Sequence, residues 1–187
     1  MDKWGKKRSV IRRYNLTAQM YDERYCEEQE AKYRAALASM NLTFDSIMLD
    51  VGCGSGMFFD QVADRARIVV GLDVSRELLS LAKDRAKKLR NAFLVLADAD
   101  HLPFKTGVFN YFFAFTVLQN MPSPVETIKE LQVSASPNAS FVITGLRAAI
   151  SLEKFNWILR KAGLKTVSIR DDEAIKCYIA VAVQSQN

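Results

Sequence analysis

The chain has 187 residues and a formal net charge of +5, and its 49% hydrophobic and 25% charged residues are typical of one globular domain. No apolar run approaches the roughly 20 residues that cross a bilayer, and the basic start lacks the hydrophobic segment of a signal peptide, so we expect a cytoplasmic protein. The three cysteines lie far apart without a C-x-x-C pair, which indicates neither a metal site nor a disulfide framework.

Positive charge gathers at the amino terminus, in Lys3, Lys6, Lys7, Arg8, Arg12 and Arg13. Such a run is more often a solvated face or a frayed tail than a binding patch, but the modest net charge leaves contact with RNA open. From Tyr14 to Leu37, aromatic and apolar residues at roughly helical spacing predict helix. Residues 41–46 then form the turn into the first strand.

The apolar run Ile47–Val51 breaks into glycines at alternate positions, Gly52, Gly54 and Gly56. This pattern predicts a buried parallel strand and a tight turn into a helix that begins near Met57. Because glycine has no Cβ, a ligand can approach the backbone of such a turn closely. Cys53 is interpreted as a small residue that fits the turn.

The spacing of these glycines distinguishes between ligands. Dinucleotide-binding turns carry G-x-G-x-x-G, whereas this turn is G-x-G-x-G and follows Asp50, whose carboxylate would repel a pyrophosphate and suits a ligand with a cation. In these residues the chain resembles the class I S-adenosylmethionine-dependent methyltransferases. The resemblance implies that Asp50, Gly52, Cys53, Gly54 and Gly56 hold S-adenosylmethionine. The alternative is a structural loop without a ligand.

A second strand, residues 67–73, ends on Asp73 about 20 residues after the glycines, where doubly wound folds place a carboxylate against ribose hydroxyls. Asp73 is therefore the predicted ribose ligand. Its alternative role as a helix N-cap suits Ser75 better, at the start of an amphipathic helix over residues 75–89.

The third strand, residues 92–98, also ends on an acid, Asp98. The resemblance implies that Asp98 accepts the adenine amino group, that Ala99 donates its N–H to the ring, and that Val74 and Phe115 also contact the cofactor. His101, the only histidine, is expected on the solvated rim.

The resemblance further implies that Tyr14 and Tyr21 pack across the cofactor as a lid, although aromatic residues at helical spacing also cover sheet edges. A continuous apolar run over residues 108–116 predicts a central strand buried on both faces. Gln119 and Asn120 follow its carboxyl end and are predicted to face the methyl acceptor.

The remaining elements are a helix at 124–133, a strand at 140–144, a helix at 152–162, and strands at 166–169 and 177–181. A short charged turn at 171–173 joins the last two strands, so one of them should be antiparallel. We predict a single Rossmann-like α/β domain with a seven-stranded, mostly parallel sheet and helices on both faces. Residues 1–45 would form a lid and residues 46–187 the methyltransferase core.

The predicted reaction is methyl transfer by in-line displacement, in which positioning supplies much of the rate and no dedicated base is required. Three acceptor hypotheses stay open: RNA (tRNA) or protein of the translation machinery, a small quinone or lipid precursor, or no acceptor at all in a non-catalytic partner subunit. The resemblance implies that the apolar strand 92–97 lies at a sheet edge, where its unpaired backbone groups could pair with another chain. The resemblance to translation-linked enzymes implies that a small zinc-binding activator protein pairs with it, while a covering helix or loop is the alternative.

Overall fold

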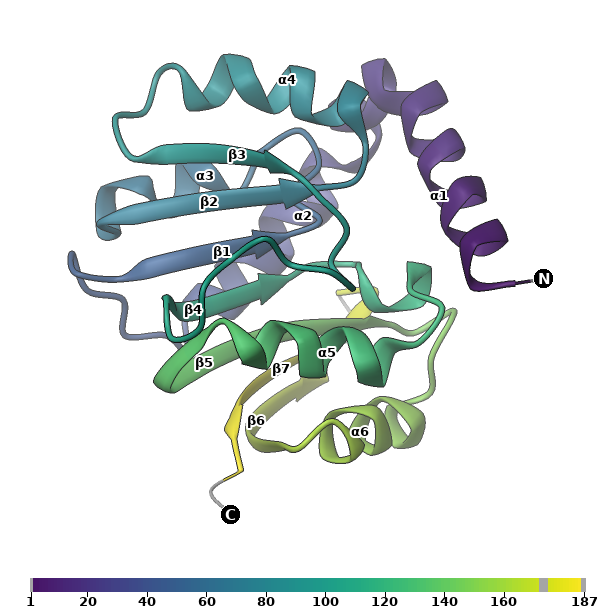
Figure 1. Ribbon diagram of the computed structural model, residues 1–187, viewed down its shortest axis with the longest axis vertical. Coiled ribbons are helices and arrows are strands. Elements are labelled where there is room, and N and C mark those ends of the chain that lie inside the picture. The colour runs from purple at the N-terminus through teal and green to yellow at the C-terminus, as the bar shows by residue number, and fades with distance from the viewer. Residues whose placement is uncertain (1, 172–174, 186–187) are drawn as a thin grey trace.

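The computed structural model describes residues 2–171 and 175–185, which form a seven-stranded sheet with helices on both faces (Figure 1). The strand order is β3-β2-β1-β4-β5-β7-β6, and β7 runs antiparallel to both of its neighbours while the other pairs are parallel. The predicted fold class and the single antiparallel strand are confirmed. The strands are β1 Ile47–Val51, β2 Ile68–Asp73, β3 Ala92–Leu96, β4 Phe109–Ala114, β5 Ala135–Leu146, β6 Leu164–Asp171 and β7 Cys177–Gln184.

Strand β4 shows why the central strands are apolar throughout. Phe112 stacks on Phe141 at 4.7 Å between ring centroids, while the next residue, Phe113, packs against Phe58 at 4.6 Å. Successive side chains of a strand point to opposite faces, so β4 contributes to two separate hydrophobic clusters, one on each side of the sheet. Burial on both faces, predicted for residues 108–116, is confirmed for this strand.

The helices divide between these two clusters. Helices α2 (Tyr21–Leu37), α3 (Phe59–Val62) and α4 (Arg76–Ala86) contribute to one, and α5 (Pro124–Val133) and α6 (Leu152–Lys161) to the other. Short 3-10 turns occupy Ala18–Met20, Ala63–Arg65 and Leu118–Asn120. Among the described residues, no helix is both long and apolar enough to span a bilayer.

Several elements differ from the prediction in length, most clearly α3 and β5. The helix expected to begin near Met57 is only the single turn α3, because a 3-10 turn at Ala63–Arg65 follows it directly and leads into β2. Strand β5 begins at Ala135 rather than near residue 140 and pairs with β7 over its second half. Of the charged turn predicted at 171–173, residues 172 and 173 lie outside the described residues.

The amino-terminal segment is ordered as helix α1 (Lys3–Thr17), not as a frayed tail. Figure 1 shows α1 standing at the carboxyl ends of the strands, and Asn15 near its end contacts Ser75 at the start of α4. Helix α2 belongs to the main fold, because its Tyr33, Ala35 and Ala36 are buried in the same cluster as Met48 of β1. The strand order reverses at β1, which lies between β2 and β4, and open α/β sheets bind ligands at the carboxyl side of such a point.

Candidate active site

A cavity lies at this switch point, beneath α1 and the start of α2. Its floor comes from the ends of β1, β2 and β4, so residues distant in the sequence meet there. The lining comprises Lys7, Val10, Tyr14, Tyr21, Gly52, Gly54, Leu72, Asp73, Val74, Leu78, Ala97, Asp98, Ala99, Phe115, Thr116, Val117, Asn120 and Met121.

The glycine turn forms one wall of this first cavity. The φ angles of Gly52 and Gly54 are 67° and 57°, a left-handed conformation that residues with a Cβ rarely adopt. The amide of Gly52 donates to the carbonyl of Leu72 at 2.7 Å, which ties the turn to β2. Gly52 is exposed to the cavity, so the turn presents bare backbone to a ligand, as the sequence predicts.

Asp73 is held at the end of β2 by backbone N–H groups. Its Oδ2 accepts from Gly54 N at 2.9 Å and its Oδ1 from Ser75 N at 2.8 Å. Each carboxylate oxygen has a further lone pair, so the fixed carboxylate can still accept hydroxyl groups of a ligand. The N-cap role belongs to Ser75, whose Oγ accepts from Leu78 N at 3.2 Å.

Asp50 lies below the cavity and does not line it. The residue is only 3% exposed, and burial, followed by the nearby charge of Asp73, raises the pKa of its carboxyl to about 8. The ligand-free protein therefore holds Asp50 largely protonated near neutral pH. A cation placed close to it would favour the ionised form.

The start of α2 is fastened to the glycine turn. Ser55 Oγ donates to Asp22 Oδ1 at 2.5 Å, and Arg85 of α4 donates to Asp22 Oδ2 at 2.8 Å. The neighbouring Tyr21 ring lies 3.4 Å from where a Cβ of Gly54 would stand. The Tyr-Asp pair thus positions an aromatic ring directly over the turn.

Helix α1 closes the cavity through polar contacts, since none of its residues is buried. Lys7 Nζ lies 2.5 Å from Asp98 Oδ2 and 2.6 Å from Asp100 Oδ2, while Lys6 Nζ donates to the carbonyl of Met121 at 2.7 Å. Arg13 also donates to Asn120 Oδ1 at 2.9 Å, so at least three of the six amino-terminal cations are turned toward the protein. No sequence pattern signals these pairings, because they depend on how α1 crosses the sheet.

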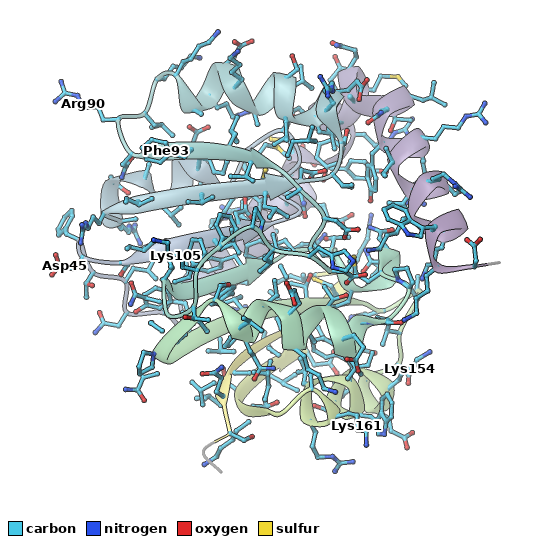
Figure 2. All side chains as sticks on the ribbon, viewed as in Figure 1. Asp45, Arg90, Phe93, Lys105, Lys154 and Lys161 are labelled. Atoms are coloured by element: carbon cyan, nitrogen blue, oxygen red, sulfur yellow. The ribbon has the colours of Figure 1, made fainter. Side chains whose placement is uncertain are left out.

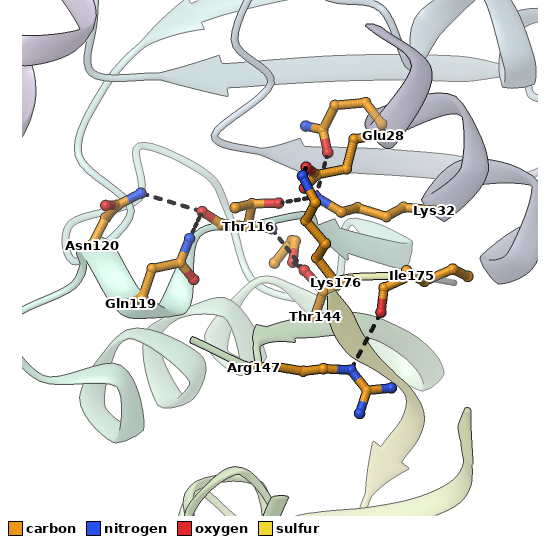
Figure 3. A network of polar contacts seen from close by, with 11 residues as sticks. Glu28, Lys32, Thr116, Gln119, Asn120, Thr144, Arg147, Ile175 and Lys176 are labelled. Carbon is orange, nitrogen blue, oxygen red and sulfur yellow. Dashed lines mark hydrogen bonds and ion pairs between the residues drawn. The ribbon is translucent and has the colours of Figure 1, made fainter. Parts of the chain in front are cut away.

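A second cavity adjoins the first and shares Tyr14, Tyr21, Thr116 and Asn120 with it. Figure 3 shows its polar network around Thr116. The carbonyl of Thr116 accepts from Gln119 Nε2 at 2.6 Å and from Asn120 Nδ2 at 3.2 Å. The 1% exposed Lys32 reaches Thr116 Oγ1 at 3.0 Å. Sequence analysis missed Lys32 and Thr116, although a lysine beside the apolar positions 33, 35 and 36 of α2 is a signal.

The predicted cofactor residues divide by position. Nine of them line the first cavity: Tyr14, Tyr21, Gly52, Gly54, Asp73, Val74, Asp98, Ala99 and Phe115. Asp50, Cys53 and Gly56 lie behind this lining. Cys53 Sγ is buried against Gly71, and a Cβ on Gly56 would lie 2.8 Å from the Phe59 ring.

Of the two acceptor candidates, Asn120 lies at both cavities and Gln119 at the second only. Among residues 2–171 and 175–185, no cluster of His, Cys, Asp or Glu could hold a metal ion.

Comparison with known proteins relates this site to methyltransferases. Residues 49–143, from β1 into β5, match the family described as methyltransferase domain. The chain is 29% identical to a malonyl-[acyl-carrier protein] O-methyltransferase of Marinomonas sp. over 75% of its own length and 52% of the relative's. It is also 29% identical to a demethylmenaquinone methyltransferase of Staphylococcus saprophyticus, over 62% and 51%. The chain thus spans about half the length of these curated relatives.

A solved structure resembles nearly the whole chain. It is a putative methyltransferase of Haloferax volcanii in complex with the Trm112 methyltransferase activator, and the TM-score is 0.82 at 17% identity, covering 95% of this chain and 98% of the other. A likeness at this identity bears on the fold alone.

Proposed function

We propose that this chain, which belongs to the methyltransferase-domain family of class I S-adenosylmethionine-dependent enzymes, transfers a methyl group from that cofactor to an acceptor bound beside α2. The observation that carries this proposal is the pair of adjoining cavities with four shared lining residues. Ligands bound in the two cavities would meet at these residues. Donor and acceptor would therefore come into contact above the end of β4.

The first cavity fits the cofactor because it combines bare backbone at one wall with a fixed carboxylate at another. Asp73 would accept the ribose hydroxyls, Asp98 the adenine amino group, and Ala99 N–H would donate to the ring. Val74 and Phe115 would pack against the adenosine part, and Tyr14 and Tyr21 would cover it. The Lys7 ion pair with Asp98 would have to open or share that carboxylate on binding.

The residues of this chain would act by holding and orienting both reactants. When bound, the cofactor supplies a methyl group on a sulfonium, which is a good leaving group. Fixing two reactants in line contributes up to about 7 to 11 kcal/mol of barrier lowering in favourable cases, so no general base is required. The roof of α1 and α2 would keep water from the reacting atoms.

We favour a small-molecule acceptor over RNA. The second cavity lies under helices, and Lys6 and Lys7 bind protein groups instead of presenting their charge outward. The relatives named for malonyl-[acyl-carrier protein] and demethylmenaquinone support the same choice.

The second candidate is a translation-linked enzyme, acting on tRNA or protein, that works with a zinc-binding activator subunit. Strand β3 lies at the sheet edge, as predicted, and its Phe93 and Leu96 are 53% and 50% exposed. A partner strand that pairs with β3 would cover both side chains. The Haloferax complex with Trm112 supports this possibility.

A methylation assay distinguishes the candidates, including a non-catalytic subunit. The purified chain is incubated with tritium-labelled S-adenosylmethionine and, separately, with small-molecule, RNA and protein extracts. We expect label in the small-molecule fraction. Label in RNA or protein would favour the translation-linked enzyme, and cofactor binding without any labelled product would favour the non-catalytic subunit.

A further inference from the structure

The second cavity is built by one face of α2 and the end of β4. Its α2 residues recur at the spacing of three and four that places side chains on one side of a helix: Tyr21, Arg24, Tyr25, Glu28, Gln29 and Lys32. The loop after β4 supplies Thr116, Gln119 and Asn120 opposite that face. Acceptor specificity, which rests here on the proposed function, should therefore be determined by these two groups of residues.

Thr116 is held in an unusual conformation at the reacting edge of this cavity. Its φ of 62° is left-handed, which costs a β-branched residue energy and persists only where surrounding contacts enforce it. Two contacts do so: Thr116 N donates to Thr144 Oγ1 at 2.7 Å, and Lys32 Nζ reaches Thr116 Oγ1 at 3.0 Å. The Thr116 carbonyl is thereby fixed toward Gln119 and Asn120.

This fixed carbonyl determines the orientation of the Gln119 amide. The Nε2 group donates to Thr116 O at 2.6 Å, and a flipped amide would place oxygen against oxygen. The Oε1 atom is therefore the free end, as Figure 3 shows, and it is buried without a hydrogen-bond partner in the described part of the chain. A buried acceptor without a partner is costly, so this atom predicts a donor on a ligand.

The charged side chains of the cavity are unbalanced. Arg13, Arg24, Lys32 and Lys176 face a single carboxylate, Glu28, which already binds Lys32 at 2.6 Å and Lys176 at 3.0 Å. Within residues 2–171 and 175–185, Arg13 and Arg24 make no salt bridge at all. Both are exposed at the rim, and Arg13 donates one N–H to Asn120 Oδ1 at 2.9 Å. A negative group of a ligand would find the remaining guanidinium donors there, which no carboxylate of the described residues neutralises.

We propose that the second cavity binds a small anionic acceptor whose nucleophile is a nitrogen or oxygen that carries hydrogen. That N–H or O–H donates to Gln119 Oε1, and the anionic group lies between Arg13 and Arg24. The nucleophile's lone pair forms the bond to the methyl carbon while the carbon–sulfur bond breaks and its electron pair stays on sulfur. The proton of the nucleophile leaves to water at the cavity mouth. An ionised carboxylate as nucleophile is disfavoured, since it has no hydrogen for Gln119.

The product of the labelling reaction tests this chemistry. We expect a labelled small molecule that an anion exchanger retains at pH 7, because its anionic group is not methylated. The product should also keep its label in mild alkali, because the methyl group is not bound as a carboxylate ester. A neutral or alkali-labile product, label confined to RNA or protein, or no labelled product would overturn the proposal. Failure of the chain to bind S-adenosylhomocysteine would instead refute the proposed function itself.

Matched variants then test the residues by calorimetry, with the identified acceptor titrated into the chain saturated with S-adenosylhomocysteine. Gln119→Met and Arg24→Gln should each weaken acceptor binding about threefold to tenfold, the range of one lost hydrogen bond or ion pair, and leave S-adenosylhomocysteine affinity unchanged. Arg90→Gln is the control, because Figure 2 places Arg90 at the side of the molecule opposite α1, and Arg90 lines neither cavity. Unchanged acceptor affinity in both test variants would contradict the assignment.

Discussion

Lys7 Nζ lies 2.5 Å from Asp98 Oδ2, so a helix that buries none of its residues is fastened to the carboxylate expected to receive the adenine amino group. The same ammonium also pairs with Asp100, at 2.6 Å. Helix α1 therefore rests on the main fold through polar contacts, which water and salt can replace. Opening of this helix would give the cofactor access to the first cavity.

The first prediction concerns the stability of this lid. Lys7→Ala should accelerate amide hydrogen exchange throughout α1 and leave β1 and β4 unchanged, because only the contacts of α1 are lost. Lys87→Ala is the control, since it removes an exposed ion pair with Asp84 on α4. Exchange in α1 as slow in Lys7→Ala as in the unmodified protein would show that this ion pair does not hold the lid.

The second prediction concerns the ribose ligand. Asp73→Ala should weaken S-adenosylhomocysteine binding by about 1.5 to 3 kcal/mol, the usual cost of losing a charged hydrogen-bond partner, or roughly tenfold to over a hundredfold in affinity. Calorimetry measures this directly. Asp45→Ala is the matched control, because Figure 2 shows Asp45 at the opposite ends of the strands. Equal affinity in the two variants would remove Asp73 from the site.

The third prediction follows from the raised pKa of Asp50, about 8, which is due to burial and then to Asp73. Between the ordinary pKa of 3.8 and this value, the folded protein holds a proton that the unfolded chain releases, so this carboxyl lowers stability as pH rises. The melting temperature of Asp50→Asn minus that of the unmodified protein should therefore increase from pH 5 to pH 8, when both are measured without ligand. A difference that stays constant with pH would exclude a buried, protonated Asp50.

The fourth prediction concerns the exposed edge strand β3. If a Trm112-type activator pairs with it, Phe93→Lys should abolish co-purification of the two proteins, because a charge would replace apolar contact area. Val167→Lys is the matched control, since Val167 is 65% exposed on β6 at the other sheet edge. Co-purification that is lost equally in both variants, or retained in both, would exclude β3 as the docking strand.

Sequence reasoning predicted the parts of the site that depend on local chemistry. The glycine turn and the acid that ends β2 depend on backbone geometry and strand ends, which leave clear patterns. The sequence contains no pattern strong enough to predict the roles of Lys7 and Lys32, because their partners Asp98 and Thr116 lie 91 and 84 residues away in the chain. The sequence also does not show which residues of the turn face the ligand. The Cys53 side chain, and the position that a Cβ on Gly56 would take, lie against the core and do not line the cavity.

The most direct test of the account is a calorimetric titration of the unmodified chain with S-adenosylhomocysteine and, separately, with NADH. The first cavity should bind one S-adenosylhomocysteine per chain, and Gly54→Arg should abolish this binding by filling the space under Tyr21. NADH should not bind measurably, because the turn lacks the longer glycine spacing with which dinucleotide-binding folds hold a pyrophosphate. Tight binding of NADH, or no binding of S-adenosylhomocysteine, would contradict the assignment of this cavity.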